Sequence, residues 1–215
     1  MILRINGPRA MWTIPQLRAE PYSYDVPTPS GISGTLASVY WKPEVEWVIQ
    51  RIEVLSPILR MTVRHNEVSS PSHKGKPIDV RKARTQRRYT YLRDVDYLVH
   101  ADLRVLRNDR GEPDPYGKHI SIAERRLRNG QFYRQPYLGT AQCPVERIEF
   151  LDDRSQAPSA IDETRPLGLI LWGQDWSDPH KPVALYYNAM LVQGVVQVPS
   201  QSETVRIAGE GHAAA

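Results

Sequence analysis

A short helix enclosed by prolines is the feature of this chain that most restricts its fold. It lies within Tyr24–Pro43, which reads YDVPTPSGISGTLASVYWKP. Thr28 is placed to cap the helix N-terminus, and Pro29 would occupy the first helical position, where a missing N–H costs no hydrogen bond. Pro43 disfavours helical geometry at the residue before it, so the helix is predicted to stop there. One apolar face is formed by Ile32, Leu36, Val39 and Tyr40.

Both ends of this helix carry candidate contacts for an anion. The first turn consists of small residues, Ser30 among them, so its backbone N–H groups are open to a phosphate. At the other end, Lys42 adds a positive charge where the chain leaves the helix. Ser30 and Lys42 are therefore candidate phosphate-binding residues.

Alternation of apolar and polar residues predicts the strands, and a capping signal predicts a second helix. That helix is expected to begin at Ser121, which forms a capping box with Glu124, and to end at Gly130. The expected strands are Met1–Asn6, Glu44–Leu55 with one break around Gln50-Arg51, Ile58–Arg64, Arg88–Leu106 and Gln142–Leu151. The order β-α-β…β-α-β is typical of an α+β domain of the ferredoxin-like or RRM-like class.

A polar, acidic stretch after residue 151 predicts a boundary between two regions. Residues 1–151 would form the ferredoxin-like domain, interrupted by a basic hairpin loop at about 67–88. Residues 152–215 would form a small C-terminal antiparallel β appendage, with strands in Leu167–Trp172 and Pro182–Val198. The tail 209–215 is expected to be disordered.

The two regions differ in charge. Residues 1–151 contain 24 Lys and Arg against 16 Asp and Glu, whereas residues 152–215 contain four against eight. A basic body favours a polyanionic partner such as a nucleic acid. Ordinary scatter of charge is the alternative.

Cysteine, histidine and apolar residues disfavour several classes of protein. Cys143 is the only cysteine, which excludes an internal disulfide and suits a reducing cytoplasm. The six histidines show no metal-ligand spacing, so neither a metal nor another cofactor is expected. No apolar run is long enough to span a membrane, and no signal-peptide pattern is found.

Lys118-His119 is the pair best suited to catalysis. It follows a turn that contains glycine and is expected to lie just before the second helix, where an anion is favoured. A neutral histidine can accept a proton from a ribose 2′-hydroxyl, while a lysine stabilises the charge that develops on the phosphorus centre. The alternative is that both residues only contact phosphate or solvent.

Basic residues are concentrated between His73 and Arg93, immediately around Tyr89 and Tyr91. Cations next to aromatic rings suit phosphate contact combined with base stacking, although a solvated hairpin tip is the alternative. The second helix adds Arg125 and Arg126 as weaker candidates. The candidate RNA-binding residues of the basic segment are Lys74, Lys76, Arg81, Lys82, Arg84, Arg87 and Arg88.

Four ordered motifs together resemble one known family. They lie at Asn6–Thr13, Tyr24–Pro43, Tyr116–His119 and Gln135–Gly139. The chain resembles the fifth family of CRISPR-associated proteins, in the subtype called Dvulg or I-C, which belongs to the RAMP superfamily. The resemblance covers most of residues 1–151 and implies a RAMP domain of the ferredoxin-like class.

The resemblance also implies a reaction. Family members that process RNA use a tyrosine, a lysine and a histidine at places that resemble Tyr40, Lys118 and His119. It implies a metal-independent endoribonuclease that cuts precursor CRISPR RNA at the repeat hairpin, by attack of a 2′-hydroxyl that leaves a 2′,3′-cyclic phosphate. His119 is the better general acid or base, because a tyrosine phenol ordinarily has a pKa of about 10.

Partners and an alternative function follow from the same resemblance. The expected partners are CRISPR RNA, the backbone and large subunits of the Cascade surveillance complex and, through that complex, target DNA. The alternative is a non-catalytic subunit that only binds the 5′ handle of the CRISPR RNA. Sequence spacing does not reveal whether Tyr40 faces RNA or the protein core.

Overall fold

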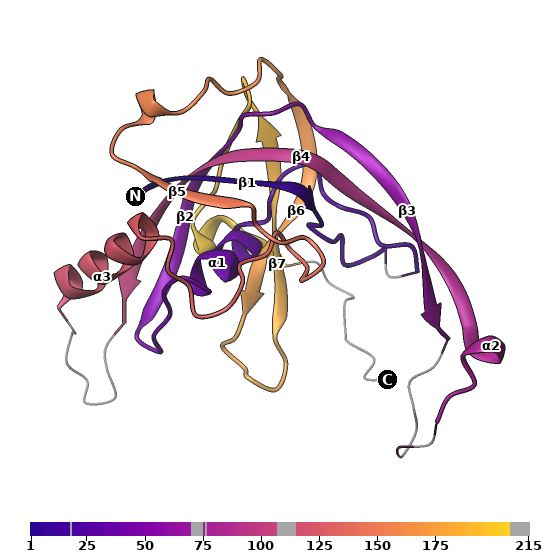
Figure 1. Cartoon of the computed structure of the whole chain (residues 1–215). Helices are drawn as coiled ribbons and strands as arrows, with labels where there is room; N and C mark the ends of the chain where they lie inside the picture. The colour runs from indigo at the N-terminus through magenta and orange to yellow at the C-terminus, as the bar shows by residue number, and fades with distance from the viewer. Residues whose placement is uncertain (18, 70–74, 76, 107–114, 207–215) are drawn as a thin grey trace.

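An antiparallel sheet of six strands is the larger of the two sheets in the described part of the chain (Figure 1). The computed structural model describes residues 1–17, 19–69, 75, 77–106 and 115–206. Lys74, Lys76 and the predicted disordered tail 209–215 lie outside these residues. The strands of this sheet are β1 (Ile2–Ala10), β2 (Val45–Val54), β3 (Leu59–Val68), β4 (Arg84–Val105), β5 (Arg147–Leu151) and β8 (Val195–Gln197).

The order of the strands confirms the predicted ferredoxin-like fold. Neighbouring strands follow the order β5-β1-β4-β2-β8, and every pairing is antiparallel. Helix α1 (Pro29–Ala37) connects β1 to β2, and α3 (Tyr116–Arg128) connects β4 to β5. Without β3 and β8, the chain therefore shows the β-α-β-β-α-β arrangement expected from the sequence.

The predicted C-terminal antiparallel sheet is also present. It consists of β6 (Arg165–Asp175), β7 (Val183–Leu191) and β9 (Val205–Arg206) in the order β6-β7-β9. Short 3₁₀ helices lie at Arg154–Gln156 and Gln201–Glu203. The chain also returns to the main sheet, because β8 pairs with β2. Buried residues of both sheets, such as Ile52 and Leu191, belong to one hydrophobic core.

Helix α1 begins as predicted and ends earlier. Thr28 is the N-cap, its hydroxyl accepts a hydrogen bond from the N–H of Gly31 at 3.1 Å, and proline occupies the first turn. The helix ends at Ala37 rather than at Pro43. The hydroxyl of Ser38 donates to the carbonyl of Thr35 at 2.7 Å, and such a side-chain bond competes with helix continuation. The predicted apolar face is buried.

Helix α3 begins before the predicted capping box. Its first residue is Tyr116, and the hydroxyl of Ser121 donates to the carbonyl of Gly117 one turn back, at 2.8 Å. Ser121 therefore lies inside the helix. The predicted end is confirmed: Gly130 has φ of 61°, and the N–H of Gln131 donates to the carbonyl of Arg126, as in a Schellman motif.

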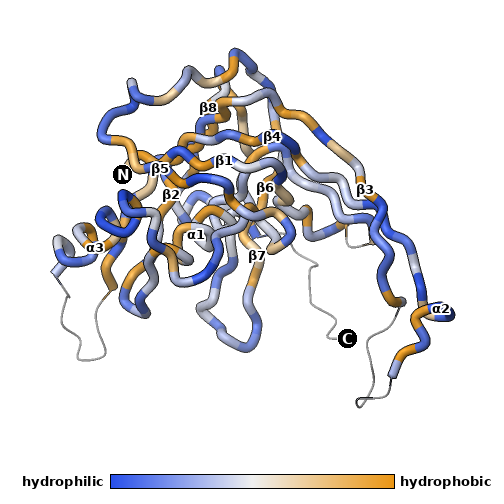
Figure 2. The backbone as a smooth tube through the Cα atoms, in the orientation of Figure 1, coloured by the Kyte–Doolittle hydropathy of each residue, from blue (hydrophilic) through white to orange (hydrophobic). Residues whose placement is uncertain are grey.

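Strands β3 and β4 extend beyond the main sheet as an arm, formed by residues 59–68 and 84–93 with the short helix α2 (Val80–Ala83) (Figure 1). The arm corrects the predicted loop at about 67–88, because β4 already begins at Arg84. In the outer part of the arm, side-chain pairs such as Asn66 with Gln86, 3.1 Å apart, stabilise the strands where apolar alternation is lacking. Figure 2 shows that the outer part of the arm is mainly hydrophilic.

The arm begins where one edge of β4 changes its partner. On that edge β2 pairs as far as Val54↔Tyr97 and β3 takes over at Leu59↔Arg93, while β1 pairs with the other edge as far as Leu92. Asp94, which lies between the two partners, has φ of 52°. The break predicted in β2 is confirmed as well, since its register shifts between Ile49 and Arg51.

Three of the four sequence motifs meet at the end of β1. The N–H of Met11 donates to the carbonyl of Leu138 at 3.0 Å. Gly139 has φ of 85°, and a Cβ there would overlap the carbonyl of Met11. The hydroxyl of Thr35 on α1 donates to the carbonyl of Tyr137 at 2.8 Å. This contact, which we call the β1 junction, joins β1, α1 and the segment 135–139.

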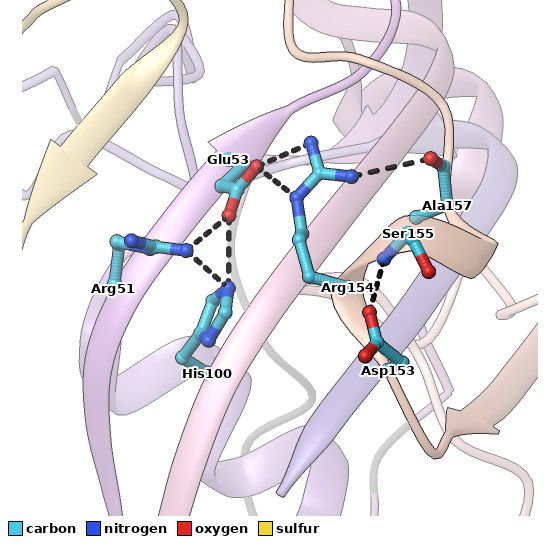
Figure 3. A network of polar contacts seen from close by, with 7 residues as sticks. All are labelled: Arg51, Glu53, His100, Asp153, Arg154, Ser155 and Ala157. Atoms are coloured by element: carbon cyan, nitrogen blue, oxygen red, sulfur yellow. Dashed lines mark hydrogen bonds and ion pairs between the residues drawn. The ribbon is translucent and has the colours of Figure 1, made fainter.

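An ion cluster around the buried side chain of Glu53 connects β2 and β4 to the segment after β5 (Figure 3). The side chain of Glu53 is 4% exposed and contacts Arg51 at 2.6 Å, His100 at 2.9 Å and Arg154 at 2.7 Å. Burial by itself raises the pKa of the Glu53 carboxyl, but hydrogen bonds from Arg154 and His100 outweigh this effect and the pKa lies below its usual value. Glu53 is therefore ionised at neutral pH.

The β1 junction predicts different costs for two glycine substitutions. Gly139→Ala should lower the free energy of unfolding by about 3 kcal/mol, because it combines a left-handed backbone with a steric clash. Gly130→Ala is the matched control: it has the same sign of φ but open space around it, and should cost about 1 kcal/mol. Urea unfolding measures both, and equal costs would contradict the junction.

The ion cluster predicts a pH-dependent stability difference. Glu53→Gln should lower the free energy of unfolding by about 2 kcal/mol at pH 7, because two guanidinium groups lose their carboxylate. A carboxyl with a depressed pKa stabilises the fold above the ordinary Glu pKa, so the difference should narrow below about pH 4. Glu46→Gln is the control, because Glu46 lies on β2 like Glu53 but forms an exposed pair with Arg104 of β4; it should cost under about 0.5 kcal/mol. Equal costs would contradict this account.

Candidate active site

Tyr40 lies where the chain leaves the last turn of α1. Its N–H donates to the carbonyl of Leu36 at 3.1 Å, and its carbonyl accepts from the indole of Trp47 on β2 at 2.8 Å. The side chain is only 1% exposed. Tyr40 therefore faces the interior, and both neighbouring elements fix its position.

His119 lies in the first turn of α3, on the buried face of that helix. It shares this face with Ala123 and Leu127, at the spacing of four residues that aligns side chains on a helix. Its exposure is 1%. The structure corrects the expectation that Lys118-His119 precedes the helix, because α3 already begins at Tyr116.

A hydrogen bond joins the two buried side chains. The Tyr40 hydroxyl lies 2.6 Å from Nδ1 of His119, although 79 positions separate the residues in sequence. The bond fixes the orientation of the imidazole, and the histidine tautomer decides which of the two atoms donates. Two of the three residues in the predicted triad are thus in direct contact.

Lys118 is the exposed member of the predicted triad. It precedes His119 on α3, and its N–H donates to the carbonyl of Pro115 at 3.1 Å. Adjacent helix residues point in directions about 100° apart. A negatively charged ligand can therefore reach Lys118 from solvent while Tyr40 and His119 lie behind it.

Arg126 adds a second cation to the site. Its guanidinium lies 5.3 Å from the centre of the Tyr40 ring and donates to the carbonyl of Val39 at 2.9 Å. It therefore connects α3 to the exit of α1. Arg125, the residue before it, is exposed on the same helix.

The other candidate RNA-binding residues are distributed over several surfaces. Ser30 and Lys42 are exposed near the two ends of α1, and Arg81 and Lys82 are exposed on α2. Arg84, Arg87 and Arg88 lie on β4 of the arm. None of them lies in the Tyr40–His119 contact.

The two faces of the arm carry different side chains. Alternation places Arg84 and Arg88 on one face, which we call the polar face, where Val68 and Arg64 of β3 are their cross-strand neighbours. Arg87 lies on the other face, where it pairs with Glu67 at 3.2 Å. Sequence reasoning missed Arg64, whose place on the polar face follows only from the strand register.

The second face of the arm carries an aromatic cluster. The rings of His65 and Tyr89 are 4.6 Å apart, and Tyr89 stacks on Tyr91 at 6.1 Å. A hydrogen bond to Glu67, together with burial, raises the pKa of Tyr89 to about 12. Arg9 lies 5.8 Å from the centre of the Tyr91 ring. The two tyrosines of this cluster are therefore uncharged at neutral pH, and Tyr91 contacts Arg9 of β1.

The described residues contain neither a cluster of metal ligands nor a membrane-spanning helix. No group of three His, Cys, Asp or Glu side chains in the described part of the chain could hold a metal ion. Among the same residues, no helix is long and apolar enough to cross a membrane.

Comparison with known proteins identifies relatives along nearly the whole chain. The family model Cas_Cas5d, described as CRISPR-associated protein (Cas_Cas5), matches residues 1–207. A protein from Mannheimia succiniciproducens named CRISPR pre-crRNA endoribonuclease Cas5d is 34% identical over 214 residues, covering 92% of this chain and 93% of the relative. A protein of the same name from Thermus thermophilus is 33% identical over 230 residues, covering 98% and 96%.

Solved structures share the fold. One described as "Crystal Structure of CRISPR-associated Protein" superposes with a TM-score of 0.71 at 23% identity, covering 94% of this chain and 93% of the other. A chain of a "CRISPR RNA-guided surveillance complex" superposes with a TM-score of 0.53 at 18% identity, covering 98% and 94%.

Proposed function

Because the chain belongs to the Cas5 family of CRISPR-associated proteins, we propose that it cuts precursor CRISPR RNA at the repeat hairpin. It then keeps the 5′ handle of the product within the type I-C Cascade complex, in the cytoplasm, beside the backbone and large subunits. The observation that carries the proposal is the 2.6 Å contact between Tyr40 and His119, beside an exposed lysine.

His119 is the general base in the proposed reaction. When Nδ1–H donates to the Tyr40 hydroxyl, Nε2 is the unprotonated nitrogen that accepts the proton of a ribose 2′-hydroxyl. The 2′-oxygen then attacks the adjacent phosphorus, and the bond from phosphorus to the 5′-oxygen breaks. The products are a 2′,3′-cyclic phosphate and a 5′-hydroxyl. The 5′-oxygen takes its proton from water, and the hydroxide that remains takes the proton from His119, which restores the free imidazole.

Tyr40 and Lys118 have different roles. Tyr40 orients the imidazole, since its own position is fixed by α1 and β2. Lys118 binds the phosphate from solvent and stabilises the charge that develops on its oxygens. Arg126 contributes a second positive charge beside Tyr40.

The polar face of the arm binds RNA at a distance from the phosphate that reacts. It presents Arg64, Arg84 and Arg88 along one side of a two-stranded ribbon, with the amides of Asn66 and Gln86 between them. Guanidinium groups in a row suit contacts with successive phosphates. Lys42, Arg81, Lys82 and Arg125 add positive charge on other surfaces.

We also propose that the chain is divided functionally near residue 151. Residues 1–151 contain the candidate catalytic residues and the arm, while residues 152–215 supply β6, β7 and β9. The acidic region 152–215 would then contact another subunit rather than RNA.

Cleavage in the presence of EDTA tests the proposed reaction. The wild-type protein should cut repeat RNA without a divalent metal, and His119→Ala should lower the rate by about 10²- to 10⁴-fold. Lys118→Ala, at an exposed position that does not disturb the fold, should lower it by about 10- to 100-fold. His180→Ala, an exposed histidine between β6 and β7, is the matched control and should cut at the wild-type rate.

Unchanged cleavage by His119→Ala would contradict the role of that residue. Tight binding of repeat RNA by the wild-type protein with no cleavage would instead establish a non-catalytic subunit that binds the 5′ handle.

The salt dependence of RNA binding tests the arm. Arg64→Ala with Arg84→Ala should weaken binding and lower the slope of log affinity against log salt by about 1.4, which corresponds to two phosphate contacts with single-stranded RNA. Arg87→Ala is the contrast, because Arg87 is paired with Glu67 on the other face and should change the slope less. Filter binding at several salt concentrations measures both. Equal slopes for all three proteins would contradict the proposed phosphate contacts.

A further inference from the structure

A cavity of about 300 Å³ lies beside the candidate active site. It is formed by the C-terminal end of α3, the segment 130–136 and the residues that lead into β5, Val145–Ile148. Its volume is at the small end of the range for ligand pockets, about 300–1,000 Å³. It therefore has room for one nucleobase but not for an RNA helix.

The lining combines apolar surface with polar groups. Val39, Leu127 and Ile148 provide apolar contacts, and Phe132 adds an aromatic ring that is 49% exposed. A half-exposed ring at a pocket is a surface on which an unpaired base can stack.

The polar groups favour a base over a phosphate as the occupant. Glu146 lines the pocket, and its carboxylate would repel a phosphate but accept hydrogen bonds from the N–H groups of a base edge. The amide of Gln135 is held in place, because its nitrogen donates to the carbonyl of Val145 at 3.2 Å. Arg126 and Arg147 also line the pocket and can contact the flanking phosphates.

One residue connects this pocket to the candidate active site. Arg126 lines the pocket, and its guanidinium lies 5.3 Å from the centre of the Tyr40 ring. Seven helix positions separate His119 from Arg126, which corresponds to about 10 Å along α3. An RNA strand that places its phosphate at Lys118 can therefore reach the pocket with a base only one or two nucleotides away.

We propose that this pocket binds a single unpaired nucleobase of the RNA, next to the nucleotide that is cut. This inference rests on the proposed function and deepens it. The base is stacked on Phe132 and hydrogen-bonded to Glu146, and Arg126 transmits its position to the Tyr40–His119 pair. The pocket thereby sets which phosphate lies at Lys118.

Binding of abasic RNA to a pocket variant tests the proposal. The probes are repeat RNAs with a 2′-deoxy sugar at the cut nucleotide, each lacking one base near the cut. Phe132→Ala should bind the intact probe about tenfold more weakly than wild type. At one position, loss of the base should weaken wild-type binding about tenfold and leave the binding of Phe132→Ala unchanged, since the two changes remove the same contact.

Trp176→Ala is the matched control, because Trp176 is an exposed aromatic residue, 61% exposed, outside the pocket. It should show the wild-type response to every abasic probe. The pocket assignment would be overturned if Phe132→Ala bound the intact probe with wild-type affinity. It would also be overturned if, at every position, loss of the base weakened binding by Phe132→Ala as much as it weakened binding by the wild type. Wild-type protein that neither binds nor cuts intact repeat RNA would instead overturn the proposed function. Phe132 is half-exposed, so the variant is expected to fold, and thermal unfolding verifies this.

Discussion

The close approach of Gly139 to the carbonyl of Met11 is the constraint on which the rest of the structure depends. Only a residue without a side chain allows the segment 135–139 to lie against the end of β1. From there, the carbonyl of Tyr137 holds α1 through Thr35. The exit of α1 thereby lies against α3, which carries His119. The β1 junction thus acts through backbone geometry, yet it decides where the candidate catalytic side chains meet.

The site combines a buried, hydrogen-bonded pair with exposed positive charge. Tyr40 and His119 lie inside the protein, where their hydrogen bond is protected from water and the imidazole keeps one orientation. Lys118 and Arg125 lie at the surface of the same helix, where they can attract phosphate. This arrangement suits a reaction in which the general base, the imidazole of His119, is held in one orientation by a hydrogen bond. The arm then provides affinity at a distance from the site.

Local signals predicted those parts of the fold that depend on a few neighbouring residues. Thr28 and Pro29 mark the start of α1, Gly130 marks the end of α3, and the break in alternation near Gln50 marks the bulge in β2. The start of α3 was predicted wrongly, because Ser121 bonds back to Gly117 within the helix instead of capping it. Only the outer part of the arm, at about 67–88, was predicted as a loop, since it lacks apolar alternation and polar pairs such as Asn66 with Gln86 stabilise the strands there.

The sequence was enough to predict the family motifs and the three candidate catalytic residues, Tyr40, Lys118 and His119. Both are properties of short segments and of the chemistry of their side chains. The contact between Tyr40 and His119, the burial of both side chains and the place of Arg126 over the Tyr40 ring could not. These contacts join residues some 80 positions apart, and no local pattern encodes such a distance. They exist only because packing around the β1 junction and the sheet holds α1 and α3 against each other.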